Sequence, residues 1–215
     1  METVAVIDFE TTGLAPEWGA RATEVAAVLV RDGRIVDRYE SLMNTGAYIP
    51  PFIEALTGIS NEMVRRAPAA SKVMRELAQF VGEHPLAAHN ASFDSKFWDA
   101  ELMRVQETRR QAFVCTMRVA RRVYPDAPNH KLGTLVRYAR LPVTGRYHRA
   151  LADAEMAANL LLEIEQALIR QYRLPGITHE MLQAIQSATR RGLGACMEQF
   201  RRSAEGDAAS QARQR

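Results

Sequence analysis

The first predicted strand restricts the fold of this chain more than any other segment. Residues 3–9 (TVAVIDF) are almost all apolar and favour β structure, a pattern that is typical of a strand buried on both faces. Acidic side chains come only at its end, at Asp8 and Glu10. The chain is therefore expected to build a sheet that is covered by helices.

The rest of the sequence extends this strand into an α/β domain. The Asp-Gly dipeptide between two further strand patterns predicts a tight hairpin. After the hairpin, strand and helix patterns alternate, which indicates a sheet with helices packed on it. The expected strands are residues 3–9, 25–30, 35–42, 86–88 and 113–115. The expected helices are residues 50–56, 61–64, 71–81, 116–123, 131–139, 150–172 and 178–200, and one more that follows His89-Asn90 and runs through Phe97, Ala100, Leu102 and Val105.

We expect one main domain followed by a short extension. Residues 1–172 form the domain, and residues 173–202 form a C-terminal helical extension that contains one extra amphipathic helix. Residues 203–215 (SAEGDAASQARQR) are small and polar, and we expect them to be a disordered tail.

Composition excludes several classes of protein. With 215 residues, 47% hydrophobic and 25% charged, the chain has the composition of a folded globular protein. Its longest apolar run is far shorter than the roughly 18 residues that a membrane span needs, and its start does not resemble a signal peptide. Two cysteines, Cys115 and Cys196, are too few for a disulfide framework, so we expect reduced thiols in a cytoplasmic protein.

The net charge of +3 conceals an uneven distribution. Residues 1–102 hold 9 basic and 15 acidic residues, whereas residues 103–149 hold 11 basic and only 2 acidic ones. A basic segment of this kind could bind a polyanion if the fold gathers its arginines on one face, or it could simply be a solvated surface.

Four acids stand at positions where strands and helices meet. Asp8 and Glu10 are two residues apart, so their side chains emerge on the same face of the sheet. Asp94 and Asp153 each stand near the start of a predicted helix, and His148 precedes the second of these helices. Each acid alone is compatible with a solvated loop or with stabilisation of a helix dipole.

Together the four acids indicate a metal site. Carboxylates about 4 Å apart repel each other by roughly 4 kcal/mol at an effective dielectric constant near 20, so their convergence requires cations. Hard oxygen ligands favour Mg²⁺ or Mn²⁺, and a pair of such ions is a common device for phosphodiester hydrolysis. Histidine has an ordinary pKa near 6.5, which suits His148 to act as the general base on an attacking water.

The segments DFETTGL (residues 8–14), HNASFD (89–94) and HRALAD (148–153) occur in the order of the three motifs of the DEDDh 3′-to-5′ exonucleases. The chain resembles this family over residues 1–168. The family includes the proofreading epsilon subunit of bacterial DNA polymerase III, exonuclease X, ribonuclease T and oligoribonuclease. Residues 57–60 are similar to the epsilon-like branch, and residues 115–122 are similar to exonuclease X.

The resemblance implies a ribonuclease H-like fold with a five-stranded mixed sheet flanked by helices. It implies that two divalent cations, Mg²⁺ or Mn²⁺, bind to Asp8, Glu10, Asp94 and Asp153, and that His148 is the base. The substrate contacts that it implies are Thr11, Thr12, Gly13, Leu14, Thr57, Ile59, Asn90 and Phe93. Leu14, Ile59 and Phe93 are equally compatible with core or loop packing.

The expected activity is metal-dependent 3′-to-5′ hydrolysis of DNA that releases nucleoside 5′-monophosphates. Two alternatives stay open: the same chemistry on RNA, and a polymerase-associated module that binds nucleic acid. The implied partners are a nucleic acid with a 3′ terminus, such as single-stranded DNA, and a DNA polymerase or another replication or repair protein. The region after residue 170 carries no clear clamp-binding peptide.

Overall fold

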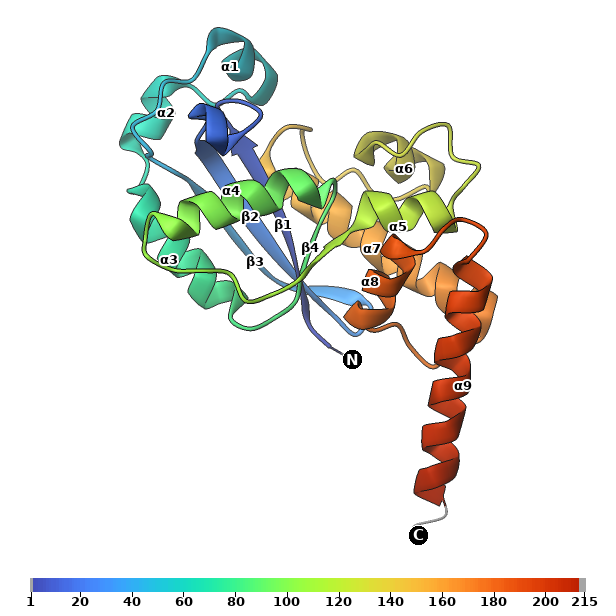
Figure 1. The fold of residues 1–215 in the computed structure, drawn as a ribbon. Helices are drawn as coiled ribbons and strands as arrows, with labels where there is room; N and C mark the ends of the chain where they lie inside the picture. The colour runs from blue at the N-terminus through green and yellow to red at the C-terminus, as the bar shows by residue number, and fades with distance from the viewer. Residues whose placement is uncertain (1, 213–215) are drawn as a thin grey trace.

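The computed structural model describes residues 2–212 and contains one five-stranded mixed sheet (Figure 1). The strand order is β3-β2-β1-β4-β5, with β1 antiparallel to β2 and parallel to β4. The strands are β1 (Val4–Thr11), β2 (Ala22–Arg31), β3 (Arg34–Leu42), β4 (Leu86–Ala88) and β5 (Phe113–Cys115). All five strands were predicted, and the predicted hairpin joins β2 to β3 through Asp32 and Gly33, both at positive φ.

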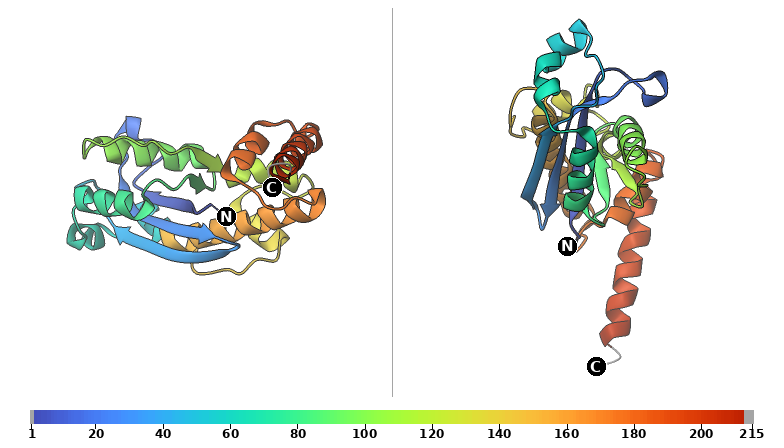
Figure 2. Two further views of the ribbon diagram at one scale, coloured as in Figure 1. Left: turned by 90° about the horizontal axis from the view of Figure 1, so that it is seen from below. Right: turned by 90° about the vertical axis from the view of Figure 1, so that its left-hand side faces the viewer.

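Helices cover both faces of the sheet (Figures 1 and 2). The long α7 packs on one face, against β1 and β2, whereas α3 and α4 pack on the other. The helices are η1 (Pro16–Trp18, a 3-10 turn), α1 (Pro51–Thr57), α2 (Asn61–Arg66), α3 (Ala70–Val81), α4 (Ala91–Met103), α5 (Thr116–Val123), α6 (Leu132–Tyr138), α7 (Ala150–Tyr172), α8 (His179–Ser187) and α9 (Leu193–Ala212).

Strand β1 is buried on both faces, as its sequence predicted. Val4 and Val6 join the core under α7, whereas Ala5 and Ile7 join the core under α3 and α4. The strand is therefore the centre of two hydrophobic cores, and the acids at its end have a rigid support.

The C-terminal segment differs from the prediction. The helix expected at residues 178–200 is two helices, α8 and α9, separated at residues 188–192. Thr189 accepts a hydrogen bond from the backbone N–H of Gly192 (3.0 Å), and such local bonds compete with helix continuation.

The predicted disordered tail is also wrong for residues 203–212, because α9 continues to Ala212. This stretch contains four alanines, the residue with the highest helix propensity, and it extends a helix that has already begun. The part of the predicted tail at residues 213–215 lies outside the described residues.

The segment after α7 shares the core of the main domain. Leu182 and Ile185 of α8 and Met197 of α9 are fully buried in the cluster that contains α7 and one face of the sheet. Cys115 and Cys196 are free thiols, as predicted. Among the described residues, none of the helices is long and apolar enough to cross a membrane.

Candidate active site

The four predicted acids and His148 border one cavity of about 370 Å³ at the end of β1. Asp8 and Glu10 come from β1, Asp94 from the first turn of α4 and Asp153 from the first turn of α7. The fold therefore brings together residues that are up to 145 positions apart in the chain.

Asp94 is placed by the turn between β4 and α4. Asn90 adopts a left-handed conformation (φ 70°) that lets the chain turn directly from strand into helix. The carboxylate of Asp94 is buried and accepts a hydrogen bond from the backbone N–H of Phe9 (3.1 Å). This bond fixes Asp94 beside the acid-bearing part of β1.

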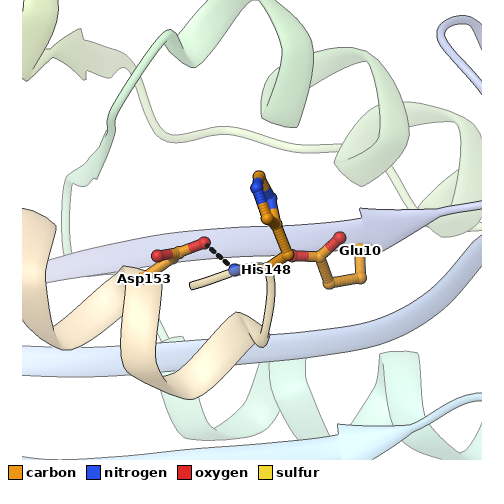
Figure 3. A group of neighbouring side chains, drawn as sticks. All are labelled: Glu10, His148 and Asp153. Carbon is orange, nitrogen blue, oxygen red and sulfur yellow. Dashed lines mark hydrogen bonds between the residues drawn. The ribbon is translucent and has the colours of Figure 1, made fainter. Parts of the chain in front are cut away.

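Asp153, His148 and Glu10 lie close together at one side of the site, and of the three only His148 is exposed (Figure 3). The backbone N–H of His148, at a positive φ of 63°, donates to Asp153 Oδ2 (2.9 Å). One potential ligand atom from each of the three residues lies within 4.8 Å of the other two. Figure 3 shows the imidazole pointing away from the backbone that carries this bond.

Burial raises the pKa values of all four acids, and the charges of neighbouring carboxylates raise those of Asp8 and Glu10 further. Burial, followed by the charges of Asp153 and Glu24, raises the pKa of Glu10 to about 8. Burial raises the pKa of Asp94 to about 8 and also raises the pKa of Asp153. The pKa of Asp8 is raised well above its ordinary value by burial and then by the charges of the other three acids. In the absence of a cation, the acids of the folded protein therefore keep protons to a higher pH. A bound cation would take over the role of these protons.

The donor set fits divalent cations. Asp153 Oδ1 is buried and has no hydrogen-bond partner within the described residues. An unpartnered buried carboxylate oxygen is costly unless it meets a proton or a cation. Clustered carboxylate oxygens are ligands that Mg²⁺ and Mn²⁺ accept.

A further acid, Glu24, positions the start of α7. It lies on β2 directly opposite Glu10, and only 1% of its surface is exposed. Its carboxylate accepts from Arg149 Nη2 (2.6 Å) and Nε, and from the backbone N–H of Ala150 (2.8 Å). The pair therefore clamps the α7 N-terminus, with Asp153, against the sheet.

The sequence prediction assigned no role to Glu24 or Arg149, although a signal was present. Glu24 interrupts an apolar strand, and an acid in such a place is seldom buried without a partner. The partner itself, 125 residues away, follows only from the fold.

A second buried ion pair holds the loop after β1. Arg21 binds Glu101 of α4 in a bidentate manner, through Nε (2.7 Å) and Nη2 (2.9 Å). The loop is closed by two further bonds between Arg21 and Thr12, one of them from the Arg21 N–H to Thr12 Oγ1 (3.0 Å). Thr12 thus serves loop closure, and it does not line the cavity.

Most of the predicted substrate contacts border the cavity. They are Thr11, Gly13, Leu14, Thr57, Asn90 and Phe93. Leu14 is 76% exposed, so it is available to a ligand. Ile59 is the exception and needs correction: its side chain is fully buried with Ile49 and Val64, because an apolar residue after a turn packs into the nearest core.

Five residues without a predicted contact also line the cavity: Phe9, Ile53, Leu56, His89 and Leu132. His89 Nε2 bonds to the carbonyl oxygen of His130 (3.0 Å), its Nδ1 to Thr116 Oγ1 (2.9 Å), and burial lowers its pKa to about 4. His89 is therefore neutral near pH 7 and joins the cavity wall to α5.

We predict that the metal-free protein loses stability between pH 6.5 and pH 8.5. The pKa values of Glu10 and Asp94 are higher in the folded state than the ordinary 4.5 and 3.8, so the folded state binds more protons and stability falls as pH rises through about 8. Urea unfolding in EDTA measures this trend. Asp94→Asn should flatten it, and added Mn²⁺ should raise the stability at pH 8.5. Stability in EDTA that rises over this interval would contradict the convergence of the acids.

We predict that Glu24→Gln lowers the free energy of unfolding by about 2 kcal/mol, because charge-assisted hydrogen bonds to Arg149 and Ala150 are lost. The matched control is Glu62→Gln, which breaks an exposed pair with Arg66 and should cost less than about 1 kcal/mol. Chemical denaturation compares the two variants. Equal losses would show that Glu24 is not a structural anchor.

Comparison with known proteins agrees with this geometry. Residues 5–161 match the sequence model of a family described as exonuclease. The chain is 34% identical over 171 residues to DNA polymerase III PolC-type of Bacillus cereus and 36% identical over 165 residues to that of Bacillus subtilis. These matches cover 79% and 76% of this chain but only 12% and 11% of the relatives, so the chain spans about an eighth of their length.

Two solved structures share the fold. Exonuclease X in complex with 5′ overhanging duplex DNA is 29% identical, with a TM-score of 0.66 over 85% of this chain and 99% of that one. The nuclease domain of 3′hExo, a DEDDh family member bound to rAMP, is 20% identical, with a TM-score of 0.65 over 82% and 96% of the two chains. The ribonuclease H-like mixed sheet is thereby confirmed. This chain belongs to the exonuclease family.

Proposed function

We propose that this chain is a metal-dependent 3′-to-5′ exonuclease that hydrolyses phosphodiester bonds at the 3′ end of DNA and releases nucleoside 5′-monophosphates. The observation that carries the proposal is the convergence of four carboxylates and His148 on one cavity. Residues 1–172 would be the exonuclease domain, and residues 173–202 its helical extension.

Each acid would bind a divalent cation, either Mg²⁺ or Mn²⁺. The charges of Glu10, Asp94 and Asp153 all raise the pKa of Asp8, so Asp8 lies within electrostatic reach of the other three acids. When bound, two such cations activate a water and stabilise the leaving 3′ oxygen.

His148 would take the proton from the attacking water. Its side chain is exposed at the cavity, and its backbone is held by the bond to Asp153. A general base needs this combination of a fixed main chain and a ring that can reach the water. Leu14, exposed at the same cavity, would pack against the terminal base.

DNA is the proposed substrate because exonuclease X, at 29% identity, has been solved with duplex DNA. The similarity to DNA polymerase III PolC-type supports a DNA polymerase, or another replication or repair protein, as a partner. The RNA alternative requires a site that recognises the 2′-hydroxyl group, and matched oligonucleotides distinguish the two.

We predict a ladder that shortens from the 3′ end when the protein digests 5′-labelled single-stranded DNA in Mg²⁺, and no digestion in excess EDTA. Asp153→Asn should abolish turnover, and His148→Ala should lower kcat by about 10²–10⁴. Asp37→Asn, an exposed aspartate on β3, is the control and should digest at the rate of the unaltered chain. A fully active Asp153→Asn variant would overturn the assignment, and faster digestion of the matched RNA would change the substrate.

A further inference from the structure

We propose that six exposed cations on α5, on α6 and in the segments that flank α6 bind the phosphates of the single strand that leads to the 3′ terminus. The proposal rests on the proposed function and names where the strand lies outside the cavity. This basic band consists of Arg118, Arg121, Lys131, Arg137, Arg140 and Arg146.

The basic band carries charge that the protein does not neutralise. Residues 116–148 contain seven basic residues and one acidic residue, Asp126. Asp126 pairs with Arg190 (3.4 Å), outside this segment. Within the described residues, no cation of the basic band forms an ion pair, in contrast to Arg21 and Arg149.

Helix α5 connects the basic band to the cavity. The first residue of α5, Thr116, bonds to His89, which lines the cavity. The charge of Arg121 also reaches His89, since it contributes, after burial and His130, to the lowered pKa of that side chain. Arg121 is an exposed residue of this same helix.

Lys131 and Arg146 flank the cavity at two further points. Lys131 directly precedes Leu132, a lining residue, and Arg146 stands two residues before His148. The Arg146 guanidinium extends to Gly58, where an added Cβ would lie only 2.9 Å from Nη1. Because Thr57 also lines the cavity, Arg146 reaches from the loop before α7 to the turn after α1.

A nucleic-acid strand that enters the acidic cavity needs a basic surface such as this band. The four acids repel phosphates until cations neutralise them, and a neighbouring field of opposite sign attracts the strand and holds it. Figure 1 shows α5 and α6 together on one side of the molecule, with η1 and α1 on the other side. Phosphates that follow α5 and α6 would leave the terminal nucleotide free to enter the cavity.

The test compares two triple variants. Arg121→Gln, Lys131→Gln and Arg146→Gln remove the part of the basic band nearest the cavity. The control replaces three exposed cations, Arg31, Arg34 and Arg75, by glutamine. The first two flank the β2–β3 hairpin, at the opposite end of β1 from Asp8.

Binding of a 5′-fluorescein single-stranded DNA 15-mer is measured by anisotropy in Ca²⁺ at several salt concentrations. For single strands, each neutralised phosphate contributes about −0.7 to the slope of log K against log salt. The basic-band variant should therefore have a slope that is smaller in magnitude by about 2, and the control should keep the slope of the unaltered chain. An unchanged slope in the basic-band variant would overturn the proposal.

Hydrolysis separates this proposal from the proposed function. Activity is compared on the oligonucleotide and on the p-nitrophenyl ester of thymidine 5′-monophosphate, which has no upstream phosphates. In the basic-band variant, kcat/KM should fall about tenfold more on the oligonucleotide than on the ester. Equal losses of kcat/KM on both substrates would contradict phosphate binding by the basic band. The proposed exonuclease activity would still stand. If the unaltered chain hydrolyses neither substrate, the proposed exonuclease activity is wrong. Phosphate binding by the basic band would still stand if the variant loses salt-dependent binding of DNA.

Discussion

The mutual repulsion of four carboxylates around one cavity is the constraint to which the rest of the structure is fitted. Two such groups about 4 Å apart repel by roughly 4 kcal/mol at an effective dielectric constant of 20. The protein sustains this because β1 is fixed between two hydrophobic cores and because backbone N–H groups hold Asp94 and Asp153. Raised pKa values show the cost of burying these acids, to which repulsion adds at Asp8 and Glu10, and protons relieve that cost in the metal-free state.

A positively charged side chain lies close to the four acids but does not lie between them. Arg149 lies near enough to lower the pKa of Glu10, but its guanidinium is held by Glu24. The same pair anchors α7, so one interaction both positions Asp153 and keeps a competing cation away from the site. Farther out, the basic band has no such partners among the described residues, and its charge faces solvent.

The sequence was sufficient for local features and for the motif residues. The apolar run of β1, the Asp-Gly hairpin and the acids at the ends of elements all follow from short-range patterns. The pairing of Glu24 with Arg149 could not be predicted, because it joins residues 125 positions apart. Ile59 was misassigned because a motif position does not reveal which way its side chain packs. The break before α9 contains local hydrogen bonds from the Gly192 N–H to Thr189, which compete with a helical pattern.

The most direct test of this account is anomalous X-ray scattering from crystals of the protein soaked in Mn²⁺ with thymidine 5′-monophosphate. The account predicts two anomalous peaks among Asp8, Glu10, Asp94 and Asp153, with the nucleotide in the same cavity. No peak at these carboxylates, at a Mn²⁺ concentration that supports digestion of DNA, would contradict it.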